Sequence, residues 1–280
     1  MISFKERDPY APINYHYEVE SVLFRQKSAF QDIMVFTNPF FGRILVLDGV
    51  VQITERDEYM YHEMLTHPAM HAHPAPKTVV VVGGGDGGIV REVLKHDSVE
   101  AVHLVEIDAM VVETARRFFP QVAAGLEDPR VTIHAMDGAV FLAEADFHAD
   151  VIIVDSTDIV GHAKSLFAQE FFRNVHNRLA AQGLYVSHTE SIHFHLPMAR
   201  QIHEVLRGIF PDVRVYTAPI ATYAGNWWCF VVGAKGGLDP STPSRWKGLD
   251  TVMYCPEMHT KAFLPDRLTA KLFSSAPWPR

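Results

Sequence analysis

The sequence predicts an α/β protein in which a doubly wound, Rossmann-like domain follows a small antiparallel β domain. Three observations support this prediction. Short apolar runs alternate with helical stripes over residues 78–233, which is typical of a mostly parallel sheet. A glycine-rich segment, residues 83–88, follows the first of these runs. Residues 1–57 instead hold short runs rich in β-branched and aromatic residues.

The N-terminal unit, residues 1–57, is predicted to be antiparallel. Its strands are expected at residues 19–24, 31–36, 43–47 and 50–54. Asp48 and Gly49 separate the last two runs, and this dipeptide suits a type I′ turn, which needs positive φ at both positions. A hairpin is therefore expected there. Residues 58–280 form the predicted second domain, with a C-terminal tail that packs back on it.

The second domain should alternate strands and helices in chain order. Asp108 is a plausible N-cap for one helix, and Gly183 is expected to end another. Helical stripes are expected around residues 90–94, 111–119, 167–179 and 202–209. The predicted strands are residues 78–82, 99–107, 131–135, 151–154, 184–188, 213–216 and 227–232.

Composition excludes several classes of protein. The 280 residues are 48% hydrophobic and carry a formal net charge of −8, which argues against a general nucleic-acid binder and favours cationic ligands. No apolar run approaches the ~20 residues that a membrane helix needs. Residues 1–10 lack the apolar stretch of a signal peptide, and two cysteines cannot form a disulfide framework. A cytoplasmic protein without a membrane partner is expected.

The glycine-rich segment satisfies G-x-G-x-x-G and carries one acidic residue, Asp86. A carboxylate in this loop would repel a pyrophosphate but attract a cationic adenosyl compound, so Asp86 disfavours NAD. Asp86 could instead be a plain helix N-cap. Glu106 ends the next predicted strand, 18 residues after Gly88, where a carboxylate can accept both ribose hydroxyls of an adenosine.

Further acids follow the third and fourth predicted strands. Asp137 and Gly138 stand where adenosyl-binding folds can bind the adenine amino group, although an ordinary turn would use the same residues. Asp155 and Asp158 flank Ser156 and Thr157 at the carboxyl edge of the sheet, where open α/β folds bind ligands. Such a pair can bind a polyamine and accept a proton from an attacking amine, or simply cap turns.

The 16 histidines require a test for a metal site. His62-Glu63 followed by His67 resembles H-E-x-x-H with one residue too many, and rings at i, i+5 lie about 140° apart on a helix. These residues, with His71 and His73, are therefore interpreted as helix and loop residues, and no metal is expected. His193 and His195 are expected to serve at the surface or behind the pocket, and Trp227 and Trp228 in the core of a closing strand.

Together these residues resemble the spermidine synthase family of polyamine aminopropyltransferases. The resemblance covers nearly the whole chain, in order. The matching segments are residues 47–52 (LDGVVQ), 54–58 (TERDE), 61–64 (YHEM), 83–88 (GGGDGG), 91–93 (REV), 105–108 (VEID), 137–138 (DG), 155–158 (DSTD), 165–167 (SLF), 222–223 (TY) and 254–265.

The resemblance implies a methyltransferase-like Rossmann domain and transfer of the aminopropyl group of decarboxylated S-adenosylmethionine to a diamine, with putrescine expected. The donor is a co-substrate, so no cofactor is implied, and a homodimer or homotetramer is expected. Asp155 is the implied proton acceptor. The implied donor-binding residues are Gln31, His62, Asp86, Glu106, Asp137, Gly138 and His162. The implied amine-binding residues are Tyr61, Gln52, Asp155, Ser156, Thr157, Asp158, His188 and Tyr223.

Four positions depart from the family pattern. Ile159 and His162 stand where the family usually has proline, His188 replaces a glutamine, and Ala221 replaces a proline. These departures cluster on the acceptor side, so cadaverine, agmatine or a longer polyamine stays an alternative acceptor. A methyltransferase using S-adenosylmethionine, an NAD oxidoreductase and a non-catalytic polyamine-binding protein are the further alternatives.

Overall fold

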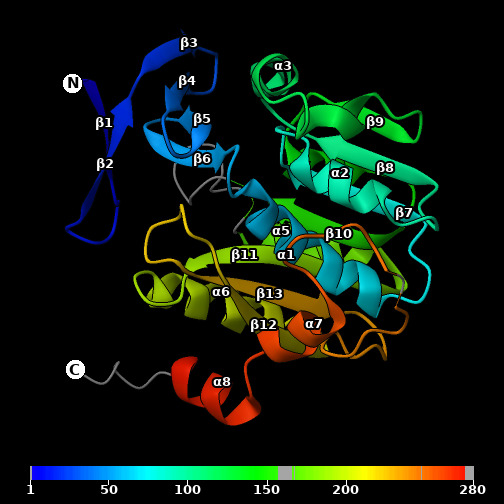
Figure 1. Cartoon of the computed structure of the whole chain (residues 1–280). Coiled ribbons are helices and arrows are strands. Elements are labelled where there is room, and N and C mark those ends of the chain that lie inside the picture. Colours follow the sequence, from blue (N-terminus) through cyan, green and yellow to red (C-terminus); the bar gives the residue numbers. More distant parts are fainter. Residues whose placement is uncertain (1, 157–165, 167, 247, 275–280) are drawn as a thin grey trace.

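The N-terminal unit consists of a two-stranded hairpin and a four-stranded sheet (Figure 1). The computed structural model describes residues 2–156, 166, 168–246 and 248–274. The hairpin pairs β1 (Ile2–Arg7) with β2 (Asn14–Val19) in antiparallel register. The antiparallel sheet has the order β3 (Ser21–Lys27), β4 (Asp32–Asn38), β5 (Gly42–Leu47), β6 (Val50–Thr54).

The predicted antiparallel unit is confirmed, but its first strands differ from the prediction. The run at residues 19–24 does not form one strand, because Val19 ends β2 and Ser21 begins β3. β1 went unpredicted because it is mostly exposed and carries three charged residues. The hairpin at Asp48 and Gly49 is confirmed, with φ of 48° and 84°.

The main sheet is mostly parallel and has seven strands within the described residues. Only β13 runs antiparallel to its neighbours, β11 and β12. The order across the sheet is β12 (Asp212–Pro219), β13 (Trp227–Ala234), β11 (Leu179–Ser191), β10 (Ala149–Asp155), β7 (Thr78–Gly83), β8 (Ala101–Val105), β9 (Val131–His134).

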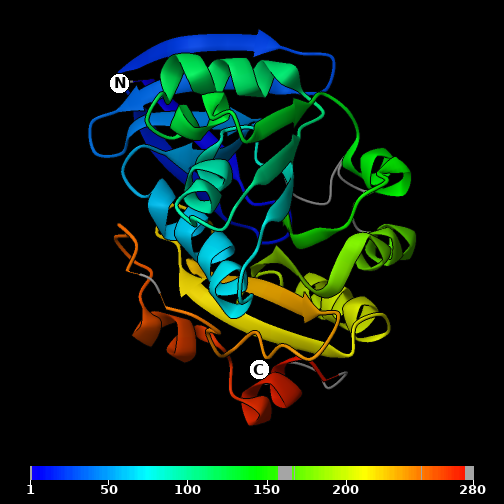
Figure 2. The same cartoon turned by 90° about the vertical axis from the view of Figure 1, so that its right-hand side faces the viewer.

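Helices cover both faces of this sheet, as a doubly wound fold requires (Figure 2). Side chains at alternate positions of β7 face opposite cores: Val79 and Val81 join one, Val80 and Val82 the other. The first core includes α1 (Glu58–Ala72), α2 (Gly88–Leu94) and α7 (Pro256–Ala262). The second includes α4 (Gly138–Glu144), α5 (Gln169–Arg178), α6 (Leu196–Arg207) and α8 (Asp266–Leu272).

The remaining helix, α3 (Ala109–Phe118), precedes a 3-10 turn at Ala123–Glu127 and packs against the N-terminal sheet. Val111 and Phe119 lie in one buried cluster with Ile33 and Leu45. The predicted N-cap is confirmed, because the Asp108 side chain accepts from the backbone N–H of Met110. The packing of α3 against the N-terminal sheet joins the two β units close to the candidate site.

Two local predictions were wrong, and one helix was missed. Gly183 does not end a helix, because α5 stops at Arg178 and β11 begins at Leu179, beside Ala149 of β10. Helix α4 was not predicted; Asp137 caps it by accepting from two backbone N–H groups. Trp227 is 40% exposed, so only its neighbour on β13 is buried. The tail does pack back on the body, and no described helix is long and apolar enough to cross a membrane.

Candidate functional site: two adjoining cavities

The candidate site lies at the carboxyl ends of β7, β8 and β10. In the sheet, β7 lies between β8 and β10. The chain leads from β7 to β8 and β9 on one side and then returns to β10 on the other side of β7, so the strand order reverses between β7 and β10. Open α/β sheets bind ligands at such a point. A cavity of about 450 Å³ opens at this point. We call it the large chamber. Its polar and glycine lining includes Gln31, Asp48, Gln52, Tyr61, Gly83, Gly84, Gly85, Asp86, Glu106, Asp137, Gly138, Asp155, Ser156 and Tyr223.

The glycine loop lies tightly against its neighbours. Gly83 has a φ of +77°, and a Cβ at this position would overlap the carbonyl oxygen of Asp155. That same oxygen accepts from the Gly84 N–H at 2.9 Å. A Cβ at Gly88 would overlap the ring of His62. Glycine is therefore required for two close approaches, one to the end of β10 and one to α1.

Asp86 combines both interpretations that the sequence left open. Its Oδ1 accepts from the Gly88 N–H at 2.7 Å at the start of α2, as a helix cap would. The same oxygen lies 3.4 Å from His62 Nε2, and Asp86 also lines the large chamber. Although burial opposes its ionisation, the contact with His62 lowers the pKa of Asp86. Asp86 therefore presents a negative charge at the wall of the chamber.

Glu106 provides the second carboxylate of the large chamber. Its Oε1 accepts from the Asp108 N–H at 2.9 Å. Burial, opposed by this hydrogen bond, raises the pKa of Glu106 to about 7. Gln31 reaches the same corner, where its Nε2 donates to Asp108 Oδ2 at 2.9 Å. This corner offers acceptors that suit the hydroxyl groups of a ligand.

Asp155 lies where the large chamber meets a second cavity of about 70 Å³, which we call the small chamber. Its Oδ1 accepts from the hydroxyl of Tyr61 at 2.6 Å. Burial and the nearby carboxylate of Asp86 raise the pKa of Asp155. A carboxylate with a raised pKa is a stronger base than a free one, which suits it to accept a proton.

Four acidic side chains line the small chamber: Glu6, Asp8, Asp155 and Glu190. The residues that line both chambers are Pro9, Val50, Gln52, Tyr61, Asp155, Ser156 and Tyr223. The residues that line only the small one are Glu6, Asp8, Tyr15, Val51, His188, Glu190, His195, Ala224 and Trp228. Tyr223 closes part of the shared wall, since its hydroxyl donates to the backbone oxygen of Gln52 at 2.6 Å.

Acids and histidines alternate along one side of the small chamber. His195 Nε2 lies 3.1 Å from Asp8 Oδ2, and its Nδ1 lies 3.7 Å from Glu190 Oε2. The other oxygen of Glu190 lies 3.7 Å from Nδ1 of His188, whose Nε2 donates to the Ser156 oxygen at 2.7 Å. Glu190 has a φ of 69°, a strained conformation that often marks functional sites.

The structure brings most of the predicted site residues together. Gln31, Asp86, Glu106, Asp137 and Gly138 line the large chamber, and His188 lines the small one. His62 lines neither, because its side chain is fully buried behind Asp86. Thr157, Asp158, Ile159 and His162 lie outside the described residues.

Sequence reasoning missed several residues of the small chamber. Glu6 and Asp8 come from the end of β1 and the turn that follows, far along the chain from the glycine loop. Glu190 could have been found, because it follows His188 by two residues and strand side chains at i, i+2 share a face. His195 precedes α6 and is buried within the chamber wall, and Trp228 lines the chamber as well as being buried.

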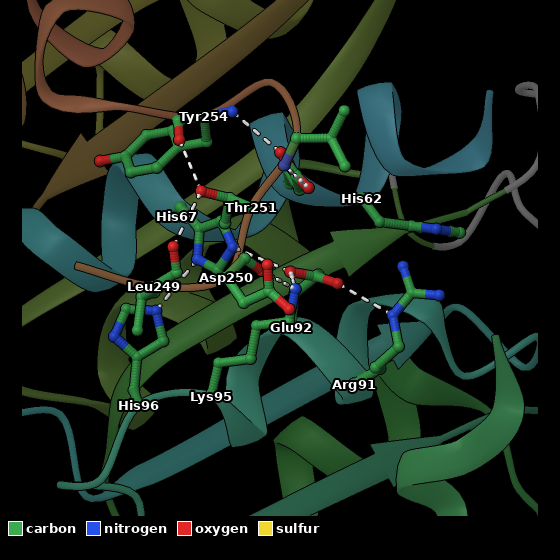
Figure 3. A network of polar contacts seen from close by, with 12 residues as sticks. His62, His67, Arg91, Glu92, Lys95, His96, Leu249, Asp250, Thr251 and Tyr254 are labelled. Carbon is green, nitrogen blue, oxygen red and sulfur yellow. Dashed lines mark hydrogen bonds and ion pairs between the residues drawn. The ribbon is translucent and has the colours of Figure 1, made fainter. Parts of the chain in front are cut away.

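Among the described residues, a metal ion could be held by His62, Asp86 and Asp155, or by His67, His71 and His96. In the second group, Arg245 can only donate to His96 Nδ1, at 3.2 Å. His96 Nε2 then donates to His67 Nδ1 at 3.0 Å, and His67 Nε2 donates to Glu92 at 2.9 Å (Figure 3). In this order the Nδ1 atoms of His67 and His96 accept hydrogen bonds and their Nε2 atoms carry protons, so none of these four nitrogens has a free lone pair for a metal. The absence of a metal stays a prediction.

Two family models match the chain. Residues 58–241 match the spermine/spermidine synthase domain, and residues 2–55 match the spermidine synthase tetramerisation domain. Among curated proteins, the chain is 47% identical to a polyamine aminopropyltransferase of Hydrogenobaculum sp. (strain Y04AAS1), covering 98% of this chain and 97% of the relative. It is 46% identical to polyamine aminopropyltransferase 1 of Aquifex aeolicus (strain VF5), covering 97% and 96%.

Two solved structures are similar over nearly the whole fold. A spermidine synthase in complex with the transition state analogue AdoDATO has a TM-score of 0.91 at 34% identity, covering 97% of this chain and 94% of that one. Spermidine synthase from Thermotoga maritima has a TM-score of 0.89 at 34% identity, covering 98% and 94%.

Proposed function

Since the chain belongs to the spermine/spermidine synthase family of polyamine aminopropyltransferases, we propose that it transfers the aminopropyl group of decarboxylated S-adenosylmethionine to putrescine. The products would be spermidine and methylthioadenosine. One observation carries the proposal: a large chamber suited to a nucleoside meets a small acidic chamber at the buried carboxyl group of Asp155.

In the large chamber, Glu106 would accept hydrogen bonds from the ribose hydroxyls of the donor. Asp137 and Gly138 would contact the adenine, and Gln31 would complete the nucleoside site. Asp86 would face the positive charge of the donor, with His62 behind it. These roles agree with the carboxylates found along the chamber wall and with its volume of about 450 Å³.

In the small chamber, the diamine would enter with one amino group toward Asp155 and the other toward the acids Glu6, Asp8 and Glu190. Tyr61, Gln52, Ser156, His188 and Tyr223 would line its path, and Thr157 and Asp158 are proposed to join them; His162 is proposed to contact the donor. A volume of about 70 Å³ favours a short, slender acceptor over a bulky one.

The reaction needs the two substrates in line. The amine lone pair attacks the aminopropyl carbon next to sulfur, a C–N bond forms, and the C–S bond breaks. The electron pair of the broken bond neutralises the sulfonium, which leaves as the thioether of methylthioadenosine. The attacking nitrogen loses one proton, which Asp155 would accept. Because the sulfonium is a good leaving group, the residues mainly position the reactants, and we propose that no cofactor or metal takes part.

We further propose a cytoplasmic homo-oligomer, a homodimer or a homotetramer. The match of residues 2–55 to a tetramerisation domain supports association. Apolar side chains on the N-terminal strands also support it, because Ile2, Val22 and Leu23 are 70%, 53% and 39% exposed. Light scattering coupled to size exclusion would distinguish monomer, dimer and tetramer.

The decisive experiment offers decarboxylated S-adenosylmethionine with putrescine, cadaverine, agmatine and spermidine, and detects products by mass spectrometry. We expect kcat/KM to be greatest for putrescine. If kcat/KM were tenfold higher for another amine, that amine would be assigned as the acceptor instead of putrescine. Methyl transfer from S-adenosylmethionine would indicate a methyltransferase, and binding without turnover would indicate a polyamine-binding protein. A hydride transfer to NAD is disfavoured by Asp86 in the glycine loop.

A further inference from the structure

Glu58, at the start of α1, lies next to the site without lining either chamber. Its side chain is 11% exposed. Oε2 lies 2.5 Å from His62 Nδ1, one helical turn along α1. Both carboxylate oxygens also accept from Arg91 of α2, at 2.8 Å each, in a two-bond ion pair. The ion pair with Arg91 of α2 thus holds the Glu58 carboxylate in place, next to the imidazole of His62 on α1.

His62 is held between two carboxylates. Its ring is fully buried, with Nδ1 on Glu58 and Nε2 at 3.4 Å from Asp86 Oδ1. The close approach of Gly88 leaves this ring no room to turn toward α2. Burial alone would lower the pKa of His62, but Asp86 and Glu58 together raise it to about 10. At neutral pH the ring therefore carries both protons. Nδ1–H donates to Glu58, and Nε2 forms an ion pair with Asp86 without a hydrogen bond.

The imidazolium of His62 has a consequence for the proposed proton acceptor. One ligand-capable atom each of His62, Asp86 and Asp155 lie within 4.8 Å of one another. Two carboxylates this close repel each other, so without a cation beside them the pKa of one would rise further. The imidazolium opposes the rise in the pKa of Asp155 that burial and Asp86 cause. It therefore helps Asp155 to stay ionised and able to accept a proton.

Other charged and titratable groups face this cluster. Tyr61 of α1 donates to Asp155, and His188 of β11 also faces it across the small chamber. Further groups near the cluster, among the residues that the structure describes, are Arg91 and Glu92 of α2, Glu106 after β8, Tyr223 before β13 and Glu190 of β11. Of these, Arg91 bonds directly to Glu58, and its Nε donates to Glu92 at 2.9 Å (Figure 3).

We infer that Glu58 is a positioning residue: it holds His62 doubly protonated, with Nε2–H toward Asp86, and so keeps both Asp86 and Asp155 ionised for the cationic donor and the attacking amine. The inference rests on the proposed function for the role of Asp155. The proton on His62 itself does not depend on that proposal. Glu58 acts only through His62 and contacts neither substrate.

The test compares Glu58→Gln with Glu63→Gln. Glu63 is a matched control, because it is a buried carboxylate on the same helix that accepts from the backbone N–H groups of Val252, Met253 and Tyr254. We expect Glu58→Gln to move the acid limb of the kcat–pH profile upward by about one pH unit. Turnover at pH values well below the wild-type midpoint should then fall about tenfold, and it should recover by pH 9. Glu63→Gln should leave the acid limb in place, whatever it does to the melting temperature.

A second arm does not depend on activity. Titration of the free protein by NMR with labelled histidine, with the His62 signal assigned by its loss in His62→Gln, should show wild-type His62 protonated through pH 8. In Glu58→Gln its titration midpoint should fall to about pH 7 or below, because the ring has lost one of its two carboxylate partners. If wild type transferred no aminopropyl group to any amine, the proposed function would fail, and this arm would still decide the role of Glu58.

Three results would overturn the inference. The first is a folded Glu58→Gln protein with an unchanged His62 titration and acid limb. The second is a loss of affinity for neutral methylthioadenosine as large as the loss of turnover, since this indicates general damage. The third is a further shift of the acid limb when Glu58→Gln is added to His62→Gln. Should Glu58→Gln not fold, Glu58→Asp keeps the charge but shortens the reach, and an unshifted acid limb in that variant would overturn the inference equally.

Discussion

The two chambers of the site differ in the origin of their walls. The large chamber is built mainly from consecutive strand ends of one parallel sheet, with the glycine loop, Glu106, Asp137 and Asp155 following β7, β8, β9 and β10. The small chamber joins the first hairpin to the ends of β11 and β13. Asp8 and His195, which meet in its wall, are 187 residues apart. In the proposed assignment, donor recognition would be a property of the sheet, and acceptor recognition a property of the contact between the two units.

The chambers also differ in how their charges are balanced. In the large chamber, the carboxylate of Asp86 has a buried cation, His62, directly behind it. In the small chamber, Asp8 and Glu190 face histidines that line the same cavity as they do. The pKa of Glu106, raised to about 7, in addition gives the large chamber a group that titrates near neutral pH. The following predictions test the two chambers separately.

The largest effect should come from the residue that both chambers share. We expect Asp155→Asn to lower kcat by roughly a hundredfold or more, because it removes the proposed proton acceptor. Affinity for methylthioadenosine, measured by calorimetry, should stay near that of wild type. Asp150→Asn is the matched control, because Asp150 lies at the opposite end of β10 and accepts from Lys77 and Thr78. If Asp155→Asn kept wild-type turnover across the pH range, Asp155 would not be the proton acceptor.

The next effect should be confined to the large chamber. Glu106→Gln replaces a carboxylate by an amide that accepts fewer hydrogen bonds, and a charged hydrogen bond contributes ~1.5–3 kcal/mol. Affinity for methylthioadenosine should fall by about 10- to 100-fold. The KM for putrescine at saturating donor should not change. Exposed Glu113 on α3 provides the control, Glu113→Gln. Unchanged affinity in Glu106→Gln would exclude the ribose assignment.

A smaller effect should appear on changing the pH alone. Because the pKa of Glu106 is raised to about 7, this side chain is mostly neutral at pH 6 and mostly ionised at pH 8. If the carboxylate is the form that binds ribose, affinity for methylthioadenosine should fall about tenfold from pH 8 to pH 6. Calorimetry across this range should give a flat profile for Glu106→Gln. A slope that persists in this variant would assign the pH dependence to another group.

The smallest effect should be confined to the small chamber. His188 lines this chamber, and its Nε2 donates to the backbone oxygen of Ser156 at 2.7 Å. We expect His188→Gln to raise the KM for putrescine several-fold, because it changes the shape of the wall along the proposed amine path. The measurement is the acceptor KM at saturating donor, with affinity for methylthioadenosine expected to stay near that of wild type. An unchanged KM for putrescine would mean that His188 does not contribute.

The same contrast explains what could be predicted from the sequence. Gly83, Asp86 and Glu106 were found because a short motif and a fixed spacing place them at neighbouring strand ends. The order of strands and helices followed from apolar periodicity in the same way. Glu6 and Asp8 could not be found, because a mostly exposed, charged first strand gives no apolar signal and no local pattern links it to residue 195.

The predictions of helix boundaries failed for a related reason. Gly183 has the composition of a helix end, but pairing of Leu179 with Ala149 of β10 extends β11 backward past it. Asp137 was interpreted as a turn or an adenine contact; in the structure it caps α4 and also lines the large chamber. In both cases a tertiary contact decides the local structure, and the sequence around the residue does not contain it.

The contact between Asp8 and His195 also has a consequence for biosynthesis. A ribosome adds about 5–20 residues per second, so the 187 residues between the two partners take roughly 10–40 s to synthesise. During that interval the nascent hairpin β1–β2 has none of its partners from β11, α6 or β13. The glycine loop, Glu106 and Asp155, in contrast, all leave the ribosome earlier than residue 188. Apart from Tyr223, the lining of the large chamber can therefore be in place on the growing chain before the small chamber exists.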